Sequence, residues 1–230
     1  MSTRDQPGNV SRLPVPADRT KNPSVPADEA KTSRYPRTTL RQERIDAVLN
    51  RRQSTLTVVL EDVHDPHNMS AVLRSCDAAG VLDIHLVFVH DQLPGAAFNR
   101  TSSGSAAKWV RTYTHESVEA CYEVLRDRDF RIFATALRDD TNDLYALDFV
   151  CPTAIVFGNE HRGVTDKAVD LADGTVGIPM QGMVESLNIS VACAVSLYEA
   201  MRQRRAAGMY DRPQLDSAQR SGLAAEWIRK

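Results

Sequence analysis

Asn68 and Arg74 are the first residues along the chain whose types and spacing could do chemistry. They lie six residues apart in the segment EDVHDPHNMSAVLRSCDAAG, and Asn68 stands at the start of a predicted helix. A helix N-terminus and a guanidinium group both attract anions, so this pair could hold a phosphate or a ribose. The alternative is that Asn68 only caps the helix and that Arg74 is a snorkelling or ion-paired surface residue. The two residues alone leave both interpretations open.

Two further loops place polar side chains at the ends of predicted strands. In the segment FGNEHRG, Gly158 lets a ligand approach the backbone closely and Glu160 adds a carboxylate. In the segment IPMQGMVESLNISVACAVSLYEA, Ser186 and Asn188 stand where a helix begins. Ordinary turns and helix caps would also explain these residues, so neither loop by itself identifies a site.

Several common kinds of site are excluded because their residues are missing. The sequence contains no G-x-G-x-x-G, G-x-S-x-G or H-E-x-x-H pattern. The segment GNEHRGVT has the glycine spacing of a P-loop, but Val164 stands where the phosphate-binding lysine belongs, which argues against NTP hydrolysis. The cysteines form no C-x-x-C pair, so we expect neither a metal site nor a disulfide framework. They are Cys76, Cys121, Cys151 and Cys193.

Apolar strands that alternate with helices must position these loops. This pattern predicts an α/β fold with a mostly parallel sheet that is covered by helices on both faces. Ligands of such folds bind at the loops beyond the carboxyl ends of the strands, where the residues above lie. The predicted strands are 55–61, 84–90, 131–137, 153–158 and 175–180, and the predicted helices are 69–79, 117–128, 165–172 and 187–206.

Proline content and charge divide the chain into parts. Six of the 11 prolines fall in the first 36 residues, where large apolar residues are too few to form a core. The net charge is +5 over residues 1–53, −10 over 54–198 and +3 over 199–230. Two basic arms could bind nucleic acid, although solvated tails would show the same excess. The predicted parts are a disordered proline-rich leader (1–36), a basic helix (37–53), an α/β domain (54–206) and a basic extension (207–230).

The composition is that of an ordinary globular protein, with 42% hydrophobic and 25% charged residues. Apolar runs stay well short of the roughly 18 residues that a membrane span needs. The first residues also lack the apolar core of a signal peptide. We therefore expect a cytoplasmic protein that does not contact a membrane.

Taken together, the three loops resemble a known family. The segments DPHNMSAVLRSCDAAG, IVFGNEHRG and IPMQGMVESLNISVACAVSLYEA resemble the three ordered motifs of the SpoU branch of the SPOUT RNA methyltransferases. The resemblance covers about residues 40–212. It implies that the α/β domain ends in a deep trefoil knot, that the protein is a homodimer, and that S-adenosylmethionine is its cofactor. It further implies methylation of a ribose 2′-oxygen in tRNA, at guanosine 18 of the D-loop.

The resemblance also implies a role for individual residues. The catalytic residue would be Arg74, which we expect to clamp the phosphate and ribose while the proton leaves through phosphate or water, because a guanidinium stays protonated. The residues that shape the site would be Asn68, Glu160, Ser186 and Asn188. The cofactor neighbours would be Thr135, Gly158, Ile178 and Leu187. The tRNA phosphate contacts would be Arg41, Arg44, Arg51, Arg52, Arg202, Arg204, Arg205 and Arg212.

Three alternatives compete with this interpretation. Ribosomal RNA could be the substrate, although residues 1–53 are too short and proline-rich for the separate RNA-binding domain that such relatives often carry. The chain could be a catalytically silent SPOUT protein that only binds RNA, although Arg74, Asn68, Glu160 and Asn188 are all present. A generic nucleotide-binding domain is a third possibility, but it would lack a phosphate-binding motif.

Overall fold

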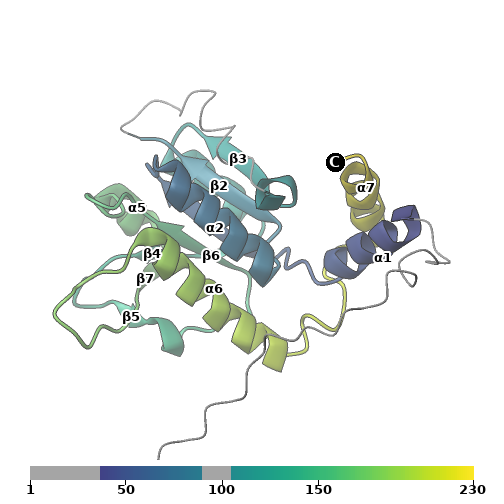
Figure 1. Cartoon of the computed structure of the whole chain (residues 1–230). Helices are drawn as coiled ribbons and strands as arrows, with labels where there is room; N and C mark the ends of the chain where they lie inside the picture. Colours follow the sequence, from purple (N-terminus) through teal and green to yellow (C-terminus); the bar gives the residue numbers. More distant parts are fainter. Residues whose placement is uncertain (1–36, 90–104) are drawn as a thin grey trace, which may run out of the picture. The chain divides into compact units, whose positions relative to one another are not determined.

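A parallel sheet with helices on both faces forms the body of the protein (Figure 1). The computed structural model describes residues 37–89 and 105–230, so the predicted disordered leader 1–36 lies outside the described residues. The strands are β1 (Leu56–Glu61), β2 (Asp83–Val87), β3 (Arg111–His115), β4 (Arg131–Thr135), β5 (Asn142–Asp143), β6 (Thr153–Phe157) and β7 (Gly174–Gly177). The helices are α1 (Arg37–Leu49), α2 (Pro66–Ala79), α4 (Val118–Arg126), α5 (Asp166–Leu171), α6 (Ile189–Ala206) and α7 (Ser217–Ile228), with short 3₁₀ turns at Ser105–Lys108 and Leu144–Ala146.

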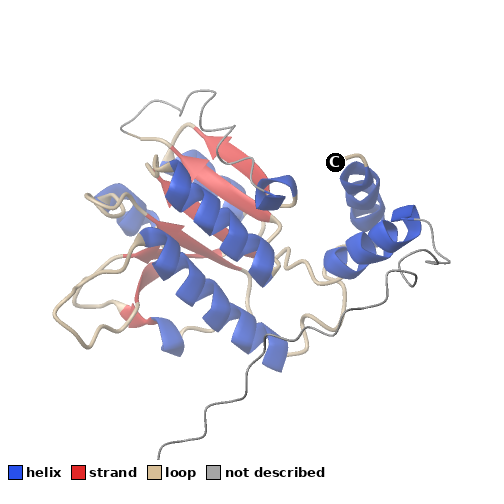
Figure 2. Ribbon diagram, in the orientation of Figure 1, coloured by secondary structure: helices blue, strands red, loops and turns tan. Residues whose placement is uncertain are grey.

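The seven strands run in the order β3-β2-β1-β6-β4-β7-β5, and every strand pair in the sheet is parallel. Central strand β1 is buried along its whole length, because its residues alternate between two cores. Val58 belongs to the core under α2 and α6, whereas Val59 belongs to the core under α4 and α5. Figure 2 shows the two helix layers with the sheet between them. The predicted α/β class, with both faces covered, is confirmed.

Strands β3 and β5 were absent from the prediction, and helix α2 begins earlier than predicted. Edge strand β3 has the sequence RTYTH and is half exposed, so it lacks the apolar run that marks a buried strand. Strand β5 has only two residues. Helix α2 begins three residues before the prediction, because Asp65 caps it and Pro66 occupies its first turn.

The C-terminal residues are more than a basic extension, because they include a packed helix that the prediction lacked. Helix α7 begins at a capping box in which Asp216 and Gln219 exchange hydrogen bonds. Its Leu223 and Trp227 are buried against Ile45 and Leu49 of α1. Helix α1 ends at Leu49 and not at residue 53 as predicted. In the described part of the chain, the helices are too short or too polar to cross a membrane.

Candidate active site

A cavity of about 540 Å³ opens at the carboxyl ends of β4, β6 and β7, where the polar loops converge. The fold thus brings together segments that are far apart in the sequence. All four predicted cofactor neighbours line the cavity, and so do three of the residues predicted to shape the site. The lining includes Thr135, Gly158, Glu160, Ile178, Ser186, Leu187 and Asn188.

The loop after β6 makes a tight return that only glycine permits. A side chain at Gly158 would overlap the backbone of Gly163 and Val164. Gly163 itself has a φ of +69°, a left-handed conformation that strains other residues. Its amide donates to the Asn159 carbonyl at 2.7 Å and closes the loop. The sequence pattern therefore has a steric cause, which is a backbone-to-backbone contact inside the loop.

Strand β1 anchors this loop through a buried carboxylate. Both oxygens of Glu61 accept hydrogen bonds from Thr165, from the backbone amide at 2.9 Å and from the hydroxyl at 2.7 Å. Asn159 adds a hydrogen bond from its side-chain amide to the Asp62 carbonyl at 2.9 Å. Glu61 is a positioning residue that was absent from the predicted site. An ionisable residue at the end of the apolar run TLTVVL was the signal, because a buried carboxylate needs partners.

Three of the predicted residues form one hydrogen-bonded network at the cavity. The amide nitrogen of Asn68 donates to Glu160 Oε1 at 2.5 Å, and that of Asn188 donates to the same oxygen at 3.0 Å. Asn188 also donates to Asn68 Oδ1 at 3.1 Å. Side chains from α2, from the loop after β6 and from the start of α6 therefore fix one another.

The cap interpretation is correct for one of these asparagines and wrong for the other. Asn188 caps α6, since its Oδ1 accepts from the Ser190 amide at 2.9 Å. Asn68 does not cap α2, because Asp65 holds that position and accepts from the His67 amide. Asn68 is instead buried inside the first turn, where its amide is free to join the network.

Arg74 lies apart from the network, on the exposed side of α2. Across the residues that the structure describes, its guanidinium has neither a hydrogen bond nor an ion pair, and it is not part of the cavity lining. The Arg74 guanidinium lies about two turns beyond the start of α2, where it is available to an anionic ligand from solvent. Ser186 is likewise exposed, at the edge of the cavity.

The predicted RNA contacts divide into exposed and buried arginines. Most are exposed, and Arg202 is held by two hydrogen bonds to Glu199, both at 2.8 Å. The exposed members are Arg41, Arg44, Arg51, Arg202, Arg205 and Arg212. The remaining two are corrected by the structure, because their guanidinium groups cannot reach a phosphate.

Arg52 is one of these corrections. It is fully buried between α1, α2 and α7, where Nη2 lies 2.5 Å from Asp77 Oδ1 and Nη1 donates to the Val81 carbonyl at 3.0 Å. The guanidinium also lies 5.1 Å from the ring centre of Trp227. Burial lowers its pKa against the opposing effect of Asp77. Arg52 therefore holds the helices together and is not an RNA contact.

Arg204 is the other correction. It is also fully buried, and it donates to the carbonyls of Phe149 at 2.8 Å and Thr55 at 2.7 Å. Burial lowers its pKa to about 10. This side chain joins α6 to the segments that precede β1 and β6, which is a structural role.

Comparison with known proteins identifies the family. Residues 55–198 match the SpoU rRNA Methylase family. The tRNA (guanosine(18)-2′-O)-methyltransferase of Thermus thermophilus is 51% identical over 194 residues, which are 84% of this chain and 98% of the relative. The Escherichia coli protein of the same name is 44% identical over 172 residues, 74% of this chain and 73% of the relative.

Solved structures agree with this match. The Aquifex aeolicus TrmH/SpoU tRNA modifying enzyme superposes with a TM-score of 0.74 at 34% identity, covering 84% of this chain and 96% of that one. The SpoU methyltransferase AviRb from Streptomyces viridochromogenes, solved with AdoMet, has a TM-score of 0.58 at 26% identity and covers 68% of this chain and 59% of that one. The chain described here belongs to the SpoU methylase family.

Proposed function

We propose that the protein transfers a methyl group from S-adenosylmethionine to the ribose 2′-oxygen of guanosine 18 in tRNA. One observation carries the proposal. The Asn68–Glu160–Asn188 network borders a cavity that the predicted cofactor neighbours line. The family match and the names of the relatives from Thermus and Escherichia supply the reaction and the substrate.

The cavity suits S-adenosylmethionine in size and in lining. Its volume of about 540 Å³ lies within the usual range of small-molecule sites. Ile178 and Leu187 offer apolar surface, and Gly158 exposes backbone. Thr135 is fixed by the hydrogen bond that its hydroxyl donates to the Val156 carbonyl at 2.9 Å. When bound, the cofactor supplies an activated methyl group on a sulfonium, so the protein has only to bind and orient the reactants.

The described residues have two further tasks, which are to orient the reactants and to bind the charged phosphate. The Asn68–Glu160–Asn188 network holds two amides and a carboxylate in fixed directions at the cavity, where misplacement of a reactant by about 1 Å can slow transfer about 10²-fold. Arg74 binds the phosphate next to the target ribose and aligns the hydroxyl. The Arg74 guanidinium stays protonated, so the hydroxyl proton leaves to phosphate oxygen or water.

The exposed arginines support tRNA as the substrate. They lie on α1, on the second half of α6 and just beyond these two helices. All of them fall outside residues 54–198, the part of the chain whose net charge is −10. We propose that Arg41, Arg44, Arg51, Arg202, Arg205 and Arg212 contact tRNA phosphates. Such contacts position RNA without reading its sequence.

We also propose a homodimer. Helix α6 exposes Val191 and Tyr198, and the segment before it exposes Met183 and Val184. A second copy of the chain would cover this apolar surface. Light scattering on the purified protein should give twice the mass of one chain, and the mass of a single chain would contradict the proposal.

We further propose that the chain forms a deep trefoil knot. The segments 135–144, 158–164 and 176–192 meet around one cavity, which suits a chain whose C-terminal part is threaded through an earlier loop. Stretching single molecules by their two ends should leave a tightened knot. The extended length would then fall short of that of a free chain of 230 residues. A full-length extension would contradict the knot.

The function is tested with unmodified whole-tRNA transcripts and labelled S-adenosylmethionine. A matched transcript carries 2′-deoxyguanosine at position 18 and is otherwise identical. We expect label on the normal transcript and none on the deoxy transcript, because the acceptor oxygen is missing. Equal labelling of both transcripts would contradict the site. Absence of label on tRNA, with label on ribosomal RNA, would replace the substrate and keep the chemistry.

A further inference from the structure

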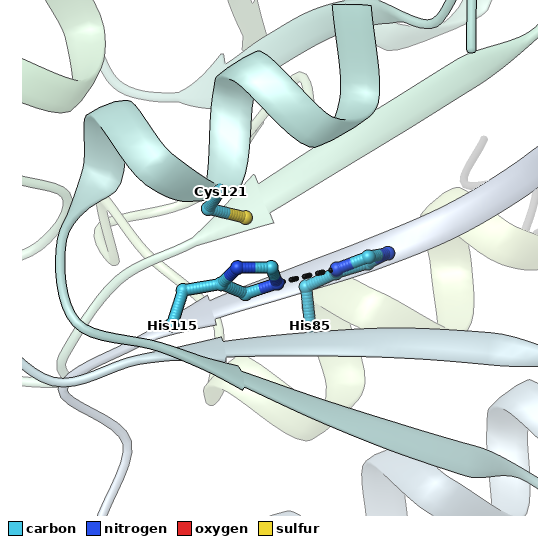
Figure 3. Close-up of side chains that lie close together, drawn as sticks. All are labelled: His85, His115 and Cys121. Atoms are coloured by element: carbon cyan, nitrogen blue, oxygen red, sulfur yellow. Dashed lines mark hydrogen bonds between the residues drawn. The ribbon is translucent and has the colours of Figure 1, made fainter. Parts of the chain in front are cut away.

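A cluster of three metal-ligating side chains lies outside the candidate active site. His85 of β2, His115 at the end of β3 and Cys121 in the first turns of α4 point toward one another, as Figure 3 shows. One donor atom from each residue lies within 4.8 Å of the other two. None of the three lines the cavity at β4, β6 and β7. From this cluster we infer a zinc site that ties α4 to the β3 edge of the sheet.

The sheet register explains why the two histidines meet. His85 pairs with Tyr113 and Val87 pairs with His115, so His85 and His115 are diagonal neighbours on the same face of two adjacent strands. His85 Nδ1 lies 2.8 Å from His115 Nε2. The ring centres are 5.1 Å apart and the ring planes differ by 25°, so the two nitrogens face each other almost head to head. A cation can bind both nitrogens only when the two rings turn so that their lone pairs converge on one point beside this contact.

The donor set selects the metal. Two imidazole nitrogens and one thiolate suit Zn²⁺ and do not suit Mg²⁺ or Ca²⁺, which prefer oxygen. Tetrahedral zinc holds nitrogens about 3.3 Å apart, given Zn–N distances near ~2.05 Å. The two rings must therefore separate by about 0.5 Å from their contact of 2.8 Å. Zinc binding therefore requires both rings to turn and the Cys121 sulfur to approach them, and water would complete the coordination from the exposed side of His115.

A neutral imidazole ring has one nitrogen with a lone pair, and this is the form that binds zinc. Burial lowers the pKa of His85 to about 4 and also lowers the pKa of His115. One ring must move its proton from the facing nitrogen to its outer nitrogen, which releases no proton. In the metal-bound form both outer nitrogens carry a proton, and that of His85, Nε2, is buried without a hydrogen-bond partner among the described residues, which is a cost of metal binding.

Zinc binding also depends on the Cys121 thiol and on the charges around the cluster. Burial raises the pKa of Cys121 to about 12, so the thiol is protonated until a metal arrives. Binding forms the Zn–S bond and releases one proton to solvent. Arg128 is the nearby cation that opposes a metal, as its effect on the pKa of His85 shows. Its Nη2 lies 3.7 Å from the carboxylate of buried Asp83, which offsets that charge.

The site differs from what the cysteine spacing predicted. The cysteines are too far apart in the sequence for a C-x-x-C site, but the parallel order β1-β2-β3 followed by α4 brings one of them to two histidines. Zinc would join three consecutive elements at an edge strand that is otherwise half exposed. Its role is therefore structural, and methyl transfer does not require it.

Cobalt(II) tests the site, because it occupies zinc sites and its spectrum reports the ligands. The full chain is stripped with chelator, kept reduced and titrated with Co²⁺. We expect a thiolate-to-cobalt charge-transfer band that saturates at one metal per chain and disappears when Zn²⁺ is added. Cys121→Ser should lose this band. His115→Gln, at a half-exposed position that tolerates change, should weaken cobalt binding at least about tenfold. Cys151→Ser, the matched control, should behave as the wild type.

A second readout is thermal stability. Zn²⁺ should raise the melting temperature of the wild type and of Cys151→Ser, because a ligand that binds only the folded state stabilises it. The same concentration of Zn²⁺ should raise that of His115→Gln less. A wild-type spectrum without the charge-transfer band would overturn the inference, and so would an unchanged band in Cys121→Ser.

Discussion

The amide nitrogen of Asn68 lies 2.5 Å from Oε1 of Glu160, across 92 residues of sequence. The same oxygen accepts from Asn188 at 3.0 Å. One carboxylate oxygen therefore holds both amides. Asn188 also donates to Asn68 at 3.1 Å and Asn68 to Asp65 at 3.3 Å, so removal of Glu160 loosens the network and does not dissolve it. Glu160 therefore acts as the centre of the network, although it is itself exposed.

The first prediction concerns this centre. Glu160→Ala should lower the methyl-transfer rate about 10²-fold, because both asparagine amides lose the acceptor that they share and are held less firmly. The rate of Glu160→Gln should lie between those of the wild type and Glu160→Ala, since the amide oxygen of glutamine still accepts a hydrogen bond but carries no charge. His161→Ala, an exposed neighbour on the same loop, is the control and should leave the rate unchanged. Single-turnover transfer to tRNA is the measurement, and a wild-type rate in Glu160→Ala would disprove the role of the network.

The second prediction concerns the tight loop after β6. A Cβ at Gly158 overlaps the backbone of Gly163 and Val164, so Gly158→Ala must displace the loop that lines the cavity. We expect a loss of stability of about 1–3 kcal/mol and a loss of cofactor affinity of at least about tenfold. The matched control is Gly182→Ala, where a Cβ meets no atom within 4 Å. Calorimetric titration with S-adenosylmethionine and thermal unfolding measure both effects, and equal affinities in the two variants would contradict the prediction.

The third prediction separates two adjacent arginines. Arg52→Ala should lower the free energy of unfolding by about 2–4 kcal/mol, because it leaves Asp77 without its partner and opens a buried space under Trp227. Arg51→Ala should leave stability unchanged, since Arg51 is exposed. If Arg51 contacts a phosphate, its removal should weaken tRNA binding and reduce the salt slope of the affinity by about 1.

The outcomes of this pair are distinct. Denaturant unfolding gives the stability of each variant, and tRNA binding at several salt concentrations gives the slope. An Arg52→Ala protein of normal stability with weakened tRNA binding would restore Arg52 as an RNA contact. A normal salt slope in Arg51→Ala would remove Arg51 from the set.

The burial of Arg52 and Arg204 could not be predicted from the sequence. A sequence favours an exposed position for any arginine, and five arginines within 37–53 suggested a solvated face. Burial of Arg52 depends on Asp77 and Trp227, which are far from it in the sequence. Such partners are known only once the chain is folded. The alternation of strands and helices, in contrast, depends on local apolar patterns, and all the predicted strands and helices are present, although β3, β5 and α7 were missed.

The site, too, was predicted only in part. The residue types at Asn68, Glu160 and Asn188 were identified through the family resemblance, whereas their mutual hydrogen bonds follow from the parallel order of β1, β6 and β7. Helix α7 was missed although it carries a readable signal, an acidic cap at Asp216 followed three residues later by Gln219. Its apolar residues are sparse, so the helical period is weak.

The fourth prediction concerns the dependence of stability on pH. The pKa of His85 falls from 6.5 to about 4 on folding, mainly through burial. The unfolded chain therefore binds one more proton between these values, and stability is lost as pH falls from 6.5 to about 4. In chelator, His85→Gln should remove about 3 kcal/mol of this loss. His161→Gln is the exposed control. Denaturant unfolding at several pH values is the measurement, and an unchanged pH profile in His85→Gln would contradict the assignment.

The role of Arg74 in methyl transfer is tested most directly by comparing wild type, Arg74→Lys and Arg74→Ala, with labelled S-adenosylmethionine, unmodified tRNA and a separate measurement of cofactor binding. We expect label on the 2′-oxygen of guanosine 18 with the wild type. We expect a loss of about 10²-fold or more in Arg74→Ala, a smaller loss in Arg74→Lys, and normal cofactor binding in both variants. Wild-type rates in both variants, or label on a base in place of the ribose, would contradict these expectations.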